Sequence, residues 1–285
     1  MQTKELELKA NQIRQDIIEM LYIAKSGHSA GAIGMADIFT VLYNNILKHN
    51  PKKPNSNERD FVILSNGHIC PVLYATLAQN NYFPKSKLKT LRQLGTKLQG
   101  HPHNLSLPGI ENSSGSLGQG ISQAVGLASS LKRDKKSNKV YCFVGDGELE
   151  EGQCWEAIMF AAKEKLNNLI LIVDRNFIQI DGNTQNIINF GNLNKKFTAF
   201  NWTSIDIDGN NLKQIYTAFN EAKKNKLKPT CIIANTIPGK GITYMENNYK
   251  WHGKAPNEEE KNLAIKELNL EKELILKKLN KNTKI

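Results

Sequence analysis

The sequence predicts an α/β protein with a three-layer architecture, in which a parallel sheet carries helices on both faces. First, short apolar runs rich in Val and Ile alternate along the chain with longer amphipathic stretches, the order typical of a parallel sheet with crossover helices. Second, 285 residues, 40% of them hydrophobic, are enough to bury one large core. Third, no repeat, linker or low-complexity segment divides the chain. We therefore expect a single domain over residues 1–285, with a charged helical tail from about residue 257.

In the first half of the chain we expect two amphipathic helices, at residues 5–24 and 34–48, separated by the turn KSGHSAGAIG. The segment RDFVILSNGH is typical of a strand that ends in a polar loop, and a helix follows over residues 71–79. A loop rich in Gly, Pro and His covers residues 95–115. After it, GQGISQAVGLASSLKRD has the small-residue faces of a closely packed helix.

In the second half a strand at residues 139–144 is followed by a helix at about 151–165 and a strand at 168–173. Two more strands are predicted, at TSIDID and TCIIANT, with the helix NLKQIYTAFNEAKKNK between them. This alternation completes the predicted parallel sheet.

Composition limits where the protein works and what it binds. The N-terminus lacks the apolar core of a secretion signal, and no apolar run approaches the roughly 18 to 20 residues that span a bilayer. Four scattered cysteines form no CxxC pair, which favours buried thiols in a reducing compartment over a zinc site or a disulfide frame. They are Cys70, Cys142, Cys154 and Cys231. We expect a cytoplasmic protein with no membrane partner.

The formal net charge of +11 raises nucleic acid as a partner. The lysines, however, lie in solvated runs such as NPKKPNSNER and EAKKNKLKP, without interleaved aromatic residues. We therefore expect no nucleic-acid function and interpret the charge as a solvated surface with some attraction for phosphorylated ligands. A salt-dependent binding assay would test the alternative.

Polar side chains follow two strands of the predicted sheet. Asp146 follows one strand, and Asn176 follows the next, 30 residues later, about the length of a βαβ unit. Because the carboxyl ends of parallel strands share one edge, these oxygens converge if the strands are neighbours, and they suit Mg²⁺. Gly145 and Gly147 let the backbone approach a ligand. The GDG stretch alone is more typical of a strand-to-helix turn with acidic capping residues. Asn176 at the matching strand end, with IDG after it, favours the metal site.

These residues carry a family resemblance. GDGELEEG, thirty residues before DRN, resembles the thiamine-diphosphate signature of the transketolase family. The blocks SGHSAGAIGMADIF, FVILSNGH, GHPHNLSLPGIENSSGSLGQGISQAVGLA and NTIPGKGITYMENNYKWHGKAP resemble further family blocks in the same order, over roughly residues 10 to 260. The chain is most similar to the separate N-terminal subunit of a split transketolase. The resemblance implies the diphosphate-binding (PP) domain of a thiamine-diphosphate enzyme.

The resemblance also assigns the histidines. A lone histidine beside glycine is more often a loop or capping residue, but four lie in separate glycine-bearing loops that match family blocks. His28 and His252 are implied to contact sugar hydroxyls and shuttle protons, His101 to orient the ketose, and His68 to contact the diphosphate. The remaining histidines, His49 and His103, match no functional position, and we expect them to be structural.

The resemblance implies thiamine diphosphate and Mg²⁺ as cofactors. The implied metal ligands are Asp146, Asn176 and the carbonyl of Ile178. The implied cofactor-binding residues are His68, Gly115, Ser116, Leu117, Gly145, Asp146, Gly147, Asn176 and His252.

In the family, the glutamate that activates the cofactor lies on the pyrimidine-binding domain, which follows the domain matched here. The segment after Pro256 is a charged helical tail, too short for another α/β domain. The resemblance therefore implies a partner subunit with that domain, in an α2β2 heterotetramer. Glu151 is implied to join a carboxylate network across the interface, and a solvent-facing first-turn glutamate is the alternative.

The implied activity is transfer of a two-carbon ketol unit from a ketose, with phosphorylated sugars and the pentose phosphate pathway as the default. Three alternatives stay open. The chain could belong to another thiamine-diphosphate enzyme, such as a deoxyxylulose-phosphate synthase or a 2-oxo-acid dehydrogenase component. It could also be a non-catalytic scaffold or a nucleic-acid-binding protein.

Overall fold

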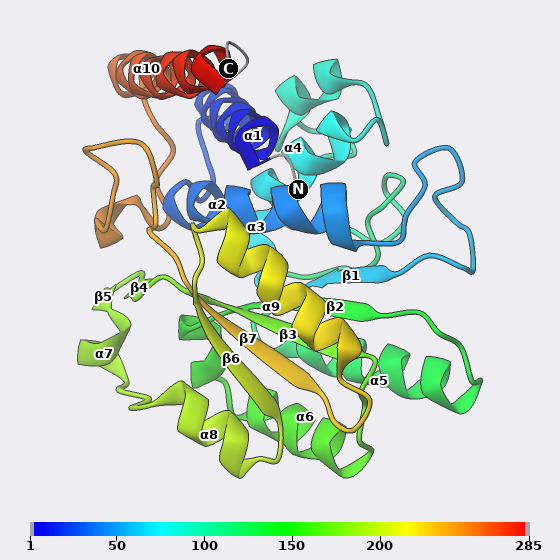
Figure 1. The fold of residues 1–285 in the computed structure, drawn as a ribbon. Helices are drawn as coiled ribbons and strands as arrows, with labels where there is room; N and C mark the ends of the chain where they lie inside the picture. Colours follow the sequence, from blue (N-terminus) through cyan, green and yellow to red (C-terminus); the bar gives the residue numbers. More distant parts are fainter. Residues whose placement is uncertain (1–2, 283–285) are drawn as a thin grey trace.

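The computed structural model describes residues 3–282, which fold around a five-stranded sheet in the order β1-β2-β3-β7-β6 (Figure 1). All four pairings in this sheet are parallel, as the sequence predicts. Its strands are β1 (Phe61–Leu64), β2 (Val140–Gly145), β3 (Leu169–Arg175), β6 (Thr203–Asp208) and β7 (Thr230–Asn235). A second, two-stranded antiparallel sheet consists of β4 (Ile178–Gln179) and β5 (Gly182–Asn183).

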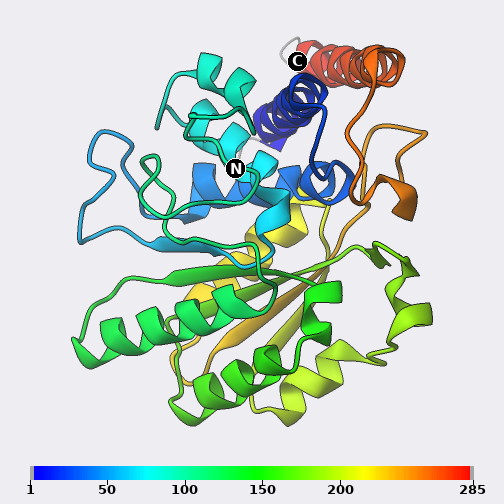
Figure 2. The ribbon, with the colours of Figure 1, turned by 180° about the vertical axis from the view of Figure 1, so that it is seen from behind.

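Helices cover both faces of the five-stranded sheet (Figures 1 and 2). One face carries α1 (Thr3–Ala24), α2 (Ala30–Gly34), α3 (Ala36–Val41), α4 (Cys70–Gln79) and α9 (Leu212–Lys224). The other face carries α5 (Gln119–Arg133), α6 (Gly152–Lys163) and α8 (Leu193–Ala199). The short α7 (Thr184–Ile187) follows β5, and α10 (Glu258–Asn282) lies on the outer side of α1. This arrangement confirms the predicted three-layer fold class.

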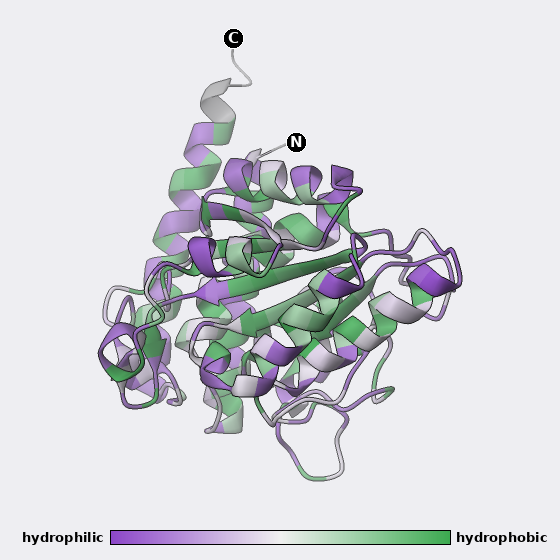
Figure 3. Ribbon diagram, turned by 90° about the horizontal axis from the view of Figure 1, so that it is seen from below, coloured by the Kyte–Doolittle hydropathy of each residue, from purple (hydrophilic) through white to green (hydrophobic). Residues whose placement is uncertain are grey.

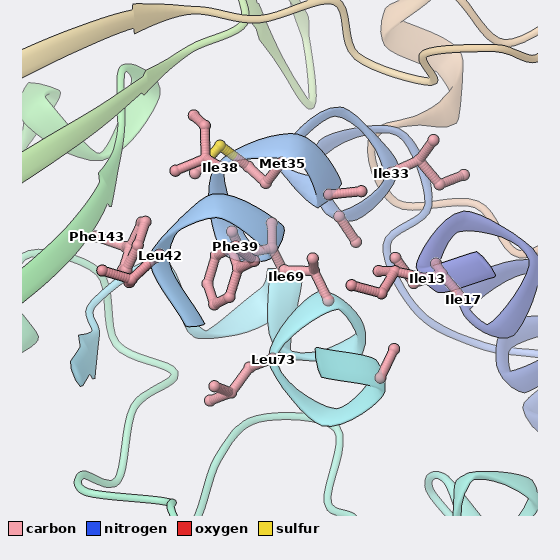
Figure 4. Packing of buried hydrophobic residues seen from close by; sticks show 14 of the residues in the cluster. Ile13, Ile17, Ile33, Met35, Ile38, Phe39, Leu42, Ile69, Leu73 and Phe143 are labelled. Atoms are coloured by element: carbon pink, nitrogen blue, oxygen red, sulfur yellow. The ribbon is translucent and has the colours of Figure 1, made fainter. Parts of the chain in front are cut away.

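The sheet separates two hydrophobic cores because successive strand side chains point to opposite faces. On β2, Tyr141 and Phe143 enter the core under α1, α3 and α4, whereas Cys142 and Val144 enter the core under α5 and α6. Phe143 stacks on Phe39 of α3 with ring centroids 4.5 Å apart, and Figure 4 shows the side chains of α1 to α4 packed around this point. Figure 3 shows green, apolar strands between helices along which hydrophobic and hydrophilic residues are mixed. The cores hold the carboxyl ends of the strands in a fixed arrangement.

The single helix predicted over residues 34–48 is wrong. Helix α2 begins earlier, at Ala30, α3 starts at Ala36, and residues 42–46 form a π turn. Gly34 ends α2 where the chain passes close to another segment, since a Cβ there would lie 2.8 Å from the carbonyl oxygen of Ile237. The β4–β5 hairpin, α7 and α8 are further elements without a counterpart in the sequence prediction.

The four cysteines are buried and free, as expected. His49 bonds to the hydroxyl of Tyr82 and the carbonyl of Tyr43, a structural role. Within residues 3–282, no helix has the length and apolar composition needed to cross a membrane.

Candidate functional site

A cavity of about 280 Å³ lies where β1, β2 and β3 end. Asn66 follows β1, Asp146 follows β2 and Asn176 follows β3, and all three line the cavity. The register pairs Gly145, the last residue of β2, with Asp174, the second-last residue of β3, so the two strands end side by side. Neighbouring parallel strands therefore bring the predicted Asp146 and Asn176 to one cavity.

Nearly all the residues predicted for the site line this cavity. They are His28, His68, His101, Gly115, Leu117, Gly145, Asp146, Gly147, Glu151, Asn176, Ile178 and His252. Ser116 is the exception, because it is exposed and does not line the cavity. Six further residues line the cavity without having been predicted, namely Asn66, Glu148, Glu150, Asp174, Gln179 and Ile180.

The carboxylate of Asp146 is buried and held by three donors. Its Oδ1 accepts from the backbone N–H of Gly147 at 2.9 Å. Its Oδ2 accepts from the N–H of Phe177 at 2.9 Å and from the hydroxyl of Thr184 at 3.2 Å. Phe177 presents that N–H from a left-handed backbone conformation with φ of 62°, which costs energy for a residue with a Cβ. The turn after β3 is thus shaped to fix Asp146.

Asn176 is oriented by a second carboxylate. Its Nδ2 donates to Asp174 Oδ2 at 2.9 Å, and its Oδ1 accepts from the N–H of Ile178 at 3.0 Å. Asp174 is itself fixed, because its Oδ1 accepts from the hydroxyl of Thr236 at 2.5 Å. Helix α2 reaches this pair closely, since a Cβ on Gly31 would lie 3.8 Å from Asn176 Nδ2.

Burial dominates the electrostatics of these two aspartates. It raises the pKa of Asp146 to about 6, although the N–H groups of Phe177 and Gly147 act in the opposite direction. Burial, together with the nearby charge of Asp146, raises the pKa of Asp174 to about 7 against the hydrogen bonds from Thr236 and Asn176. Both carboxylates would be stabilised by a cation in the cavity.

Glu148 connects three segments below the cavity. Its Oε1 accepts from the hydroxyl of Ser65 at 2.5 Å and from the N–H of Gly118 at 2.7 Å, and its Oε2 accepts from the N–H of Gly145 at 3.2 Å. Burial raises its pKa, and the three donors oppose that rise. Glu148 therefore fixes the end of β1, the start of α5 and the end of β2 relative to one another.

Three of the predicted histidines form a cluster. The ring centroid of His28 lies 4.9 Å from that of His68 and 5.4 Å from that of His252, and the last two are 5.2 Å apart. His101 lines the same cavity and is exposed. The hydroxyl of Ser29 donates to the carbonyl of Lys254 at 2.5 Å, which joins the His28 loop to the His252 loop.

Burial and crowding keep these imidazoles neutral at pH 7. Burial, with the neighbouring His252, lowers the pKa of His28 to about 4. Burial also lowers the pKa values of His68, His101 and His252. A neutral imidazole offers one N–H donor and one acceptor nitrogen, so the cluster can both give and take protons.

The oxygen atoms present fit a hard cation. Asp146, Asn176 and Ile178 all line the cavity, and a carboxylate, an amide oxygen and a backbone carbonyl are a mixture of ligands that Mg²⁺ accepts. Within residues 3–282 no group of three or more His, Cys, Asp and Glu is placed to hold a metal. The donor set therefore fits a metal that takes its remaining ligands from water and a phosphate.

Sequence reasoning overlooked Asn66, Glu148 and Asp174 for different reasons. Glu148 and Asp174 stand within or beside the GDG and DRN motifs, so their position was a usable signal. Asn66 lies in the polar loop after a predicted strand, and only its burial distinguishes it from other loop asparagines.

Comparison with known proteins matches this architecture. The family model for the thiamine diphosphate binding domain of transketolase matches residues 6–278. An apulose-4-phosphate transketolase subunit from Phocaeicola vulgatus is 37% identical over 268 residues, which are 94% of this chain and 95% of that protein. A 6-deoxy-6-sulfo-D-fructose transketolase subunit from a Clostridium species is 40% identical over 267 residues, covering 94% and 97%. Human transketolase is 37% identical over 246 residues, which are 86% of this chain and 39% of that protein.

Solved structures agree with the sequence matches. Transketolase from Campylobacter jejuni superposes with a TM-score of 0.85 at 33% identity, covering 99% of this chain and 49% of that chain. A transketolase variant from Pichia stipitis gives 0.86 at 31% identity, covering 92% and 40%. The chain spans less than half the length of these solved transketolases. From the family match, the cavity geometry and the shared fold, we conclude that this chain belongs to the transketolase family and carries its thiamine diphosphate binding domain.

Proposed function

We propose that this chain is the diphosphate-binding subunit of a two-component transketolase. With a partner that carries the pyrimidine-binding domain, it transfers a two-carbon ketol unit from a ketose to an aldose, using thiamine diphosphate and Mg²⁺. The observation that carries the proposal is the meeting of Asp146 and Asn176 at neighbouring strand ends, in a cavity that histidines also line.

Asp146, Asn176 and the carbonyl of Ile178 hold Mg²⁺ in this proposal. Among the described residues, no lysine or arginine lines the cavity, whereas five residues with carboxyl groups do. A diphosphate therefore needs a cation to balance its charge there, and the buried carboxylate of Asp146 is the anchor for that cation. Gly145 and Gly147 give the diphosphate access to the backbone.

Thiamine diphosphate, when bound, would supply the electron-accepting ring that allows a carbon–carbon bond of the ketose to be broken. His28, His101 and His252 act on the sugar. As neutral imidazoles they hold or accept protons at its hydroxyl oxygens. His68 donates an N–H to a diphosphate oxygen, as its place beside His28 and His252 allows.

The partner supplies the carboxyl group that activates the cofactor, in an α2β2 assembly. Two relatives of nearly the same length as this chain are named as subunits, which supports a partner. Exposed apolar side chains at the cavity also support it. Ile180 lines the cavity and is 71% exposed, and Ile187 and Ile188 nearby are 44% and 49% exposed. Glu151, exposed at the start of α6, is free to join a carboxylate network with the partner.

We propose a ketose with an anionic end as the donor. One relative is named for a sugar phosphate and the other for a sulfonated sugar, and a sugar of the pentose phosphate pathway is the default. A cytoplasmic location agrees with the four buried free thiols.

The test is reconstitution with a subunit that carries the pyrimidine-binding domain of a transketolase. We expect the complex to transfer ketol units from ketose phosphates but not to use pyruvate, and the chain alone to be inactive. Asp146→Ala should keep its fold and lose thiamine diphosphate, measured by calorimetric titration in the presence of Mg²⁺.

Each outcome separates the alternatives. Activity with pyruvate instead of ketoses would identify a different thiamine-diphosphate enzyme, and the absence of cofactor binding would identify a scaffold. Robust activity of the chain alone would place the activating carboxyl group on this chain. Normal Mg²⁺-dependent activity of Asp146→Ala would refute the metal assignment.

A further inference from the structure

Asn66 is a buried amide whose side chain makes no hydrogen bond with the rest of the described protein. It follows β1, is 0% exposed and lines the cavity. Neither Oδ1 nor Nδ2 has a hydrogen-bond partner among the described residues. Burying an amide in this way is costly unless a partner is supplied, so such groups call for an explanation.

The side chain of Asn66 also does not cap the helical turn that follows it, although asparagine often does so at this position. Asn66 occupies the N-cap position of the short 3₁₀ turn over residues 67–69 but makes no capping hydrogen bond. By contrast, the side chains of Asn211 and Asn248, at equivalent positions elsewhere, accept from the backbone N–H groups that follow them. The backbone of Asn66 is fixed, because its carbonyl accepts from Ile69 and its N–H donates to Phe143. The backbone of Asn66 is thus held in place while its side-chain amide has no partner among the described residues, and this combination favours a ligand-binding role.

The surroundings indicate which ligand group it meets. A Cβ on Gly145 would lie 3.9 Å from the Cβ of Asn66, so the amide stands beside the turn from Gly145 to Gly147. It is the third polar strand end in a row, next to Asp146 and Asn176. Because no lysine or arginine among the described residues lines this cavity, anionic oxygens must be bound by neutral N–H groups as well as by a metal.

We propose that Asn66 is a cofactor-binding residue whose Nδ2 donates a hydrogen bond to a diphosphate oxygen of thiamine diphosphate. The inference rests on the proposed function, because it requires that the cavity bind this cofactor. It adds a neutral donor from β1 to the ligands from β2 and β3. The amide has no hydrogen-bond partner among the described residues, and the cofactor supplies one.

The experiment measures cofactor affinity and ligand-free stability on the same proteins. The full chain and its Asn66→Ala and Asn66→Asp variants are each reconstituted with the pyrimidine-domain subunit and titrated calorimetrically with thiamine diphosphate at saturating Mg²⁺. Thermal unfolding of the same chains is followed without partner or ligand. We expect Asn66→Ala to weaken binding about tenfold, the effect of one hydrogen bond to a charged group. We expect Asn66→Asp to weaken it further, because a carboxylate keeps an acceptor but repels the diphosphate.

Ligand-free Asn66→Ala should unfold at the same temperature as the wild type or higher, since the change removes two unbonded buried polar atoms. Asn138→Ala is the matched control. Asn138 is also a buried amide, but it lies before β2, at the far end of the strand from the cavity, and its Nδ2 donates to the carbonyls of Asn57 and Arg59. It should unfold at a lower temperature and bind the cofactor within about twofold of the wild type.

Asn66→Ala binding within twofold of the wild type would overturn the inference and leave the proposed function standing. So would an Asn66→Ala variant that unfolds at a clearly lower temperature with its affinity retained, because Asn66 would then be structural. A wild-type complex with the pyrimidine-domain subunit that binds no thiamine diphosphate would overturn the proposed function and this inference with it.

Discussion

His28 illustrates how single residues in the cavity depend on their neighbours. Its ring meets those of His68 and His252, so a proton on any one of them repels a proton on the others. Burial adds to this effect, and the pKa of His28 falls to about 4 from 6.5. The residue is thus prepared to work as a neutral donor and acceptor at the pH of the cell.

This lowered pKa predicts a pH dependence of stability. Between pH 6.5 and about 4 the unfolded chain binds a proton at His28 that the folded chain does not. Stability contributed at this position is therefore present above pH 6.5 and is lost as the pH falls toward 4. His28→Asn should lose less stability between pH 7 and pH 5 than the wild type, by about 2 kcal/mol. Urea unfolding at the two pH values measures the difference.

His103→Asn serves as the control for His28→Asn, because His103 is exposed and outside the cluster. It should retain the pH dependence of the wild type. Equal pH dependence in His28→Asn and the wild type would contradict the prediction.

At the scale of elements, the cavity is held together where strand ends meet helix starts. Glu148 accepts hydrogen bonds from Ser65 after β1, from Gly118 before α5 and from Gly145 at the end of β2. One side chain thus fixes three elements, and its loss would release all of them.

Glu148→Ala should lower the free energy of unfolding by about 2 to 4 kcal/mol, since it leaves three buried donors without an acceptor. Glu148→Gln should fall between Ala and the wild type, because its amide keeps one of the two oxygens. Glu156→Ala, at an exposed position of α6, should change stability by less than about 0.5 kcal/mol. Denaturant unfolding followed by circular dichroism measures all three. A Glu148→Ala variant as stable as Glu156→Ala would show that these bonds contribute nothing.

Strands β1, β2, β3 and β7 could be predicted closely because they are nearly continuous apolar runs that are mostly buried, whereas β6 alternates polar and apolar residues at the edge of the sheet. The strand expected at residues 139–144, for example, is β2 at Val140–Gly145. The segment from residue 30 to 46 was harder, because its residues are nearly all buried and carry no amphipathic period. The β4–β5 hairpin consists of two-residue strands, too short for any pattern to appear.

The residues of the site also differ in how well the sequence predicts them. Asp146 and Asn176 could be predicted because parallel strands place their carboxyl ends on one edge. Asn66 could not, because its distinguishing property is the absence of a hydrogen bond within the described residues, which depends on the packing around it. Ser116 was predicted from its neighbours in a motif, but in the loop only Gly115 and Leu117 face the cavity.

At the scale of the whole molecule, the two longest helices lie together, although they come from opposite ends of the described chain (Figure 1). Asn11 of α1 donates to the carbonyl of Leu268 at 2.9 Å and to Glu271 Oε2 at 2.7 Å. Leu268 is 0% exposed in this contact, whereas Leu270 on the same helix is 54% exposed. Helix α10 is therefore part of the packed structure.

Leu268→Ala should lower the free energy of unfolding by about 2 to 4 kcal/mol, the cost of a cavity in a packed region. Leu270→Ala changes the same helix by the same substitution but should cost less than about 0.5 kcal/mol, because its side chain is half exposed. Urea unfolding of the two variants is the measurement. Equal effects would mean that α10 does not stabilise the domain.

The hydrogen bond from the Ser29 hydroxyl to the Lys254 carbonyl has a consequence for the synthesis of the chain. It joins residues 225 positions apart, and His252 takes its place in the cavity only through that late segment. A nascent chain on the ribosome contains Asp146 and Asn176 about 75 residues before it contains His252, so one wall of the cavity is missing until that residue has been translated. The cavity is therefore complete only after the segment around residue 254 has been synthesised and has folded against the His28 loop, so the order of the chain delays the formation of the site.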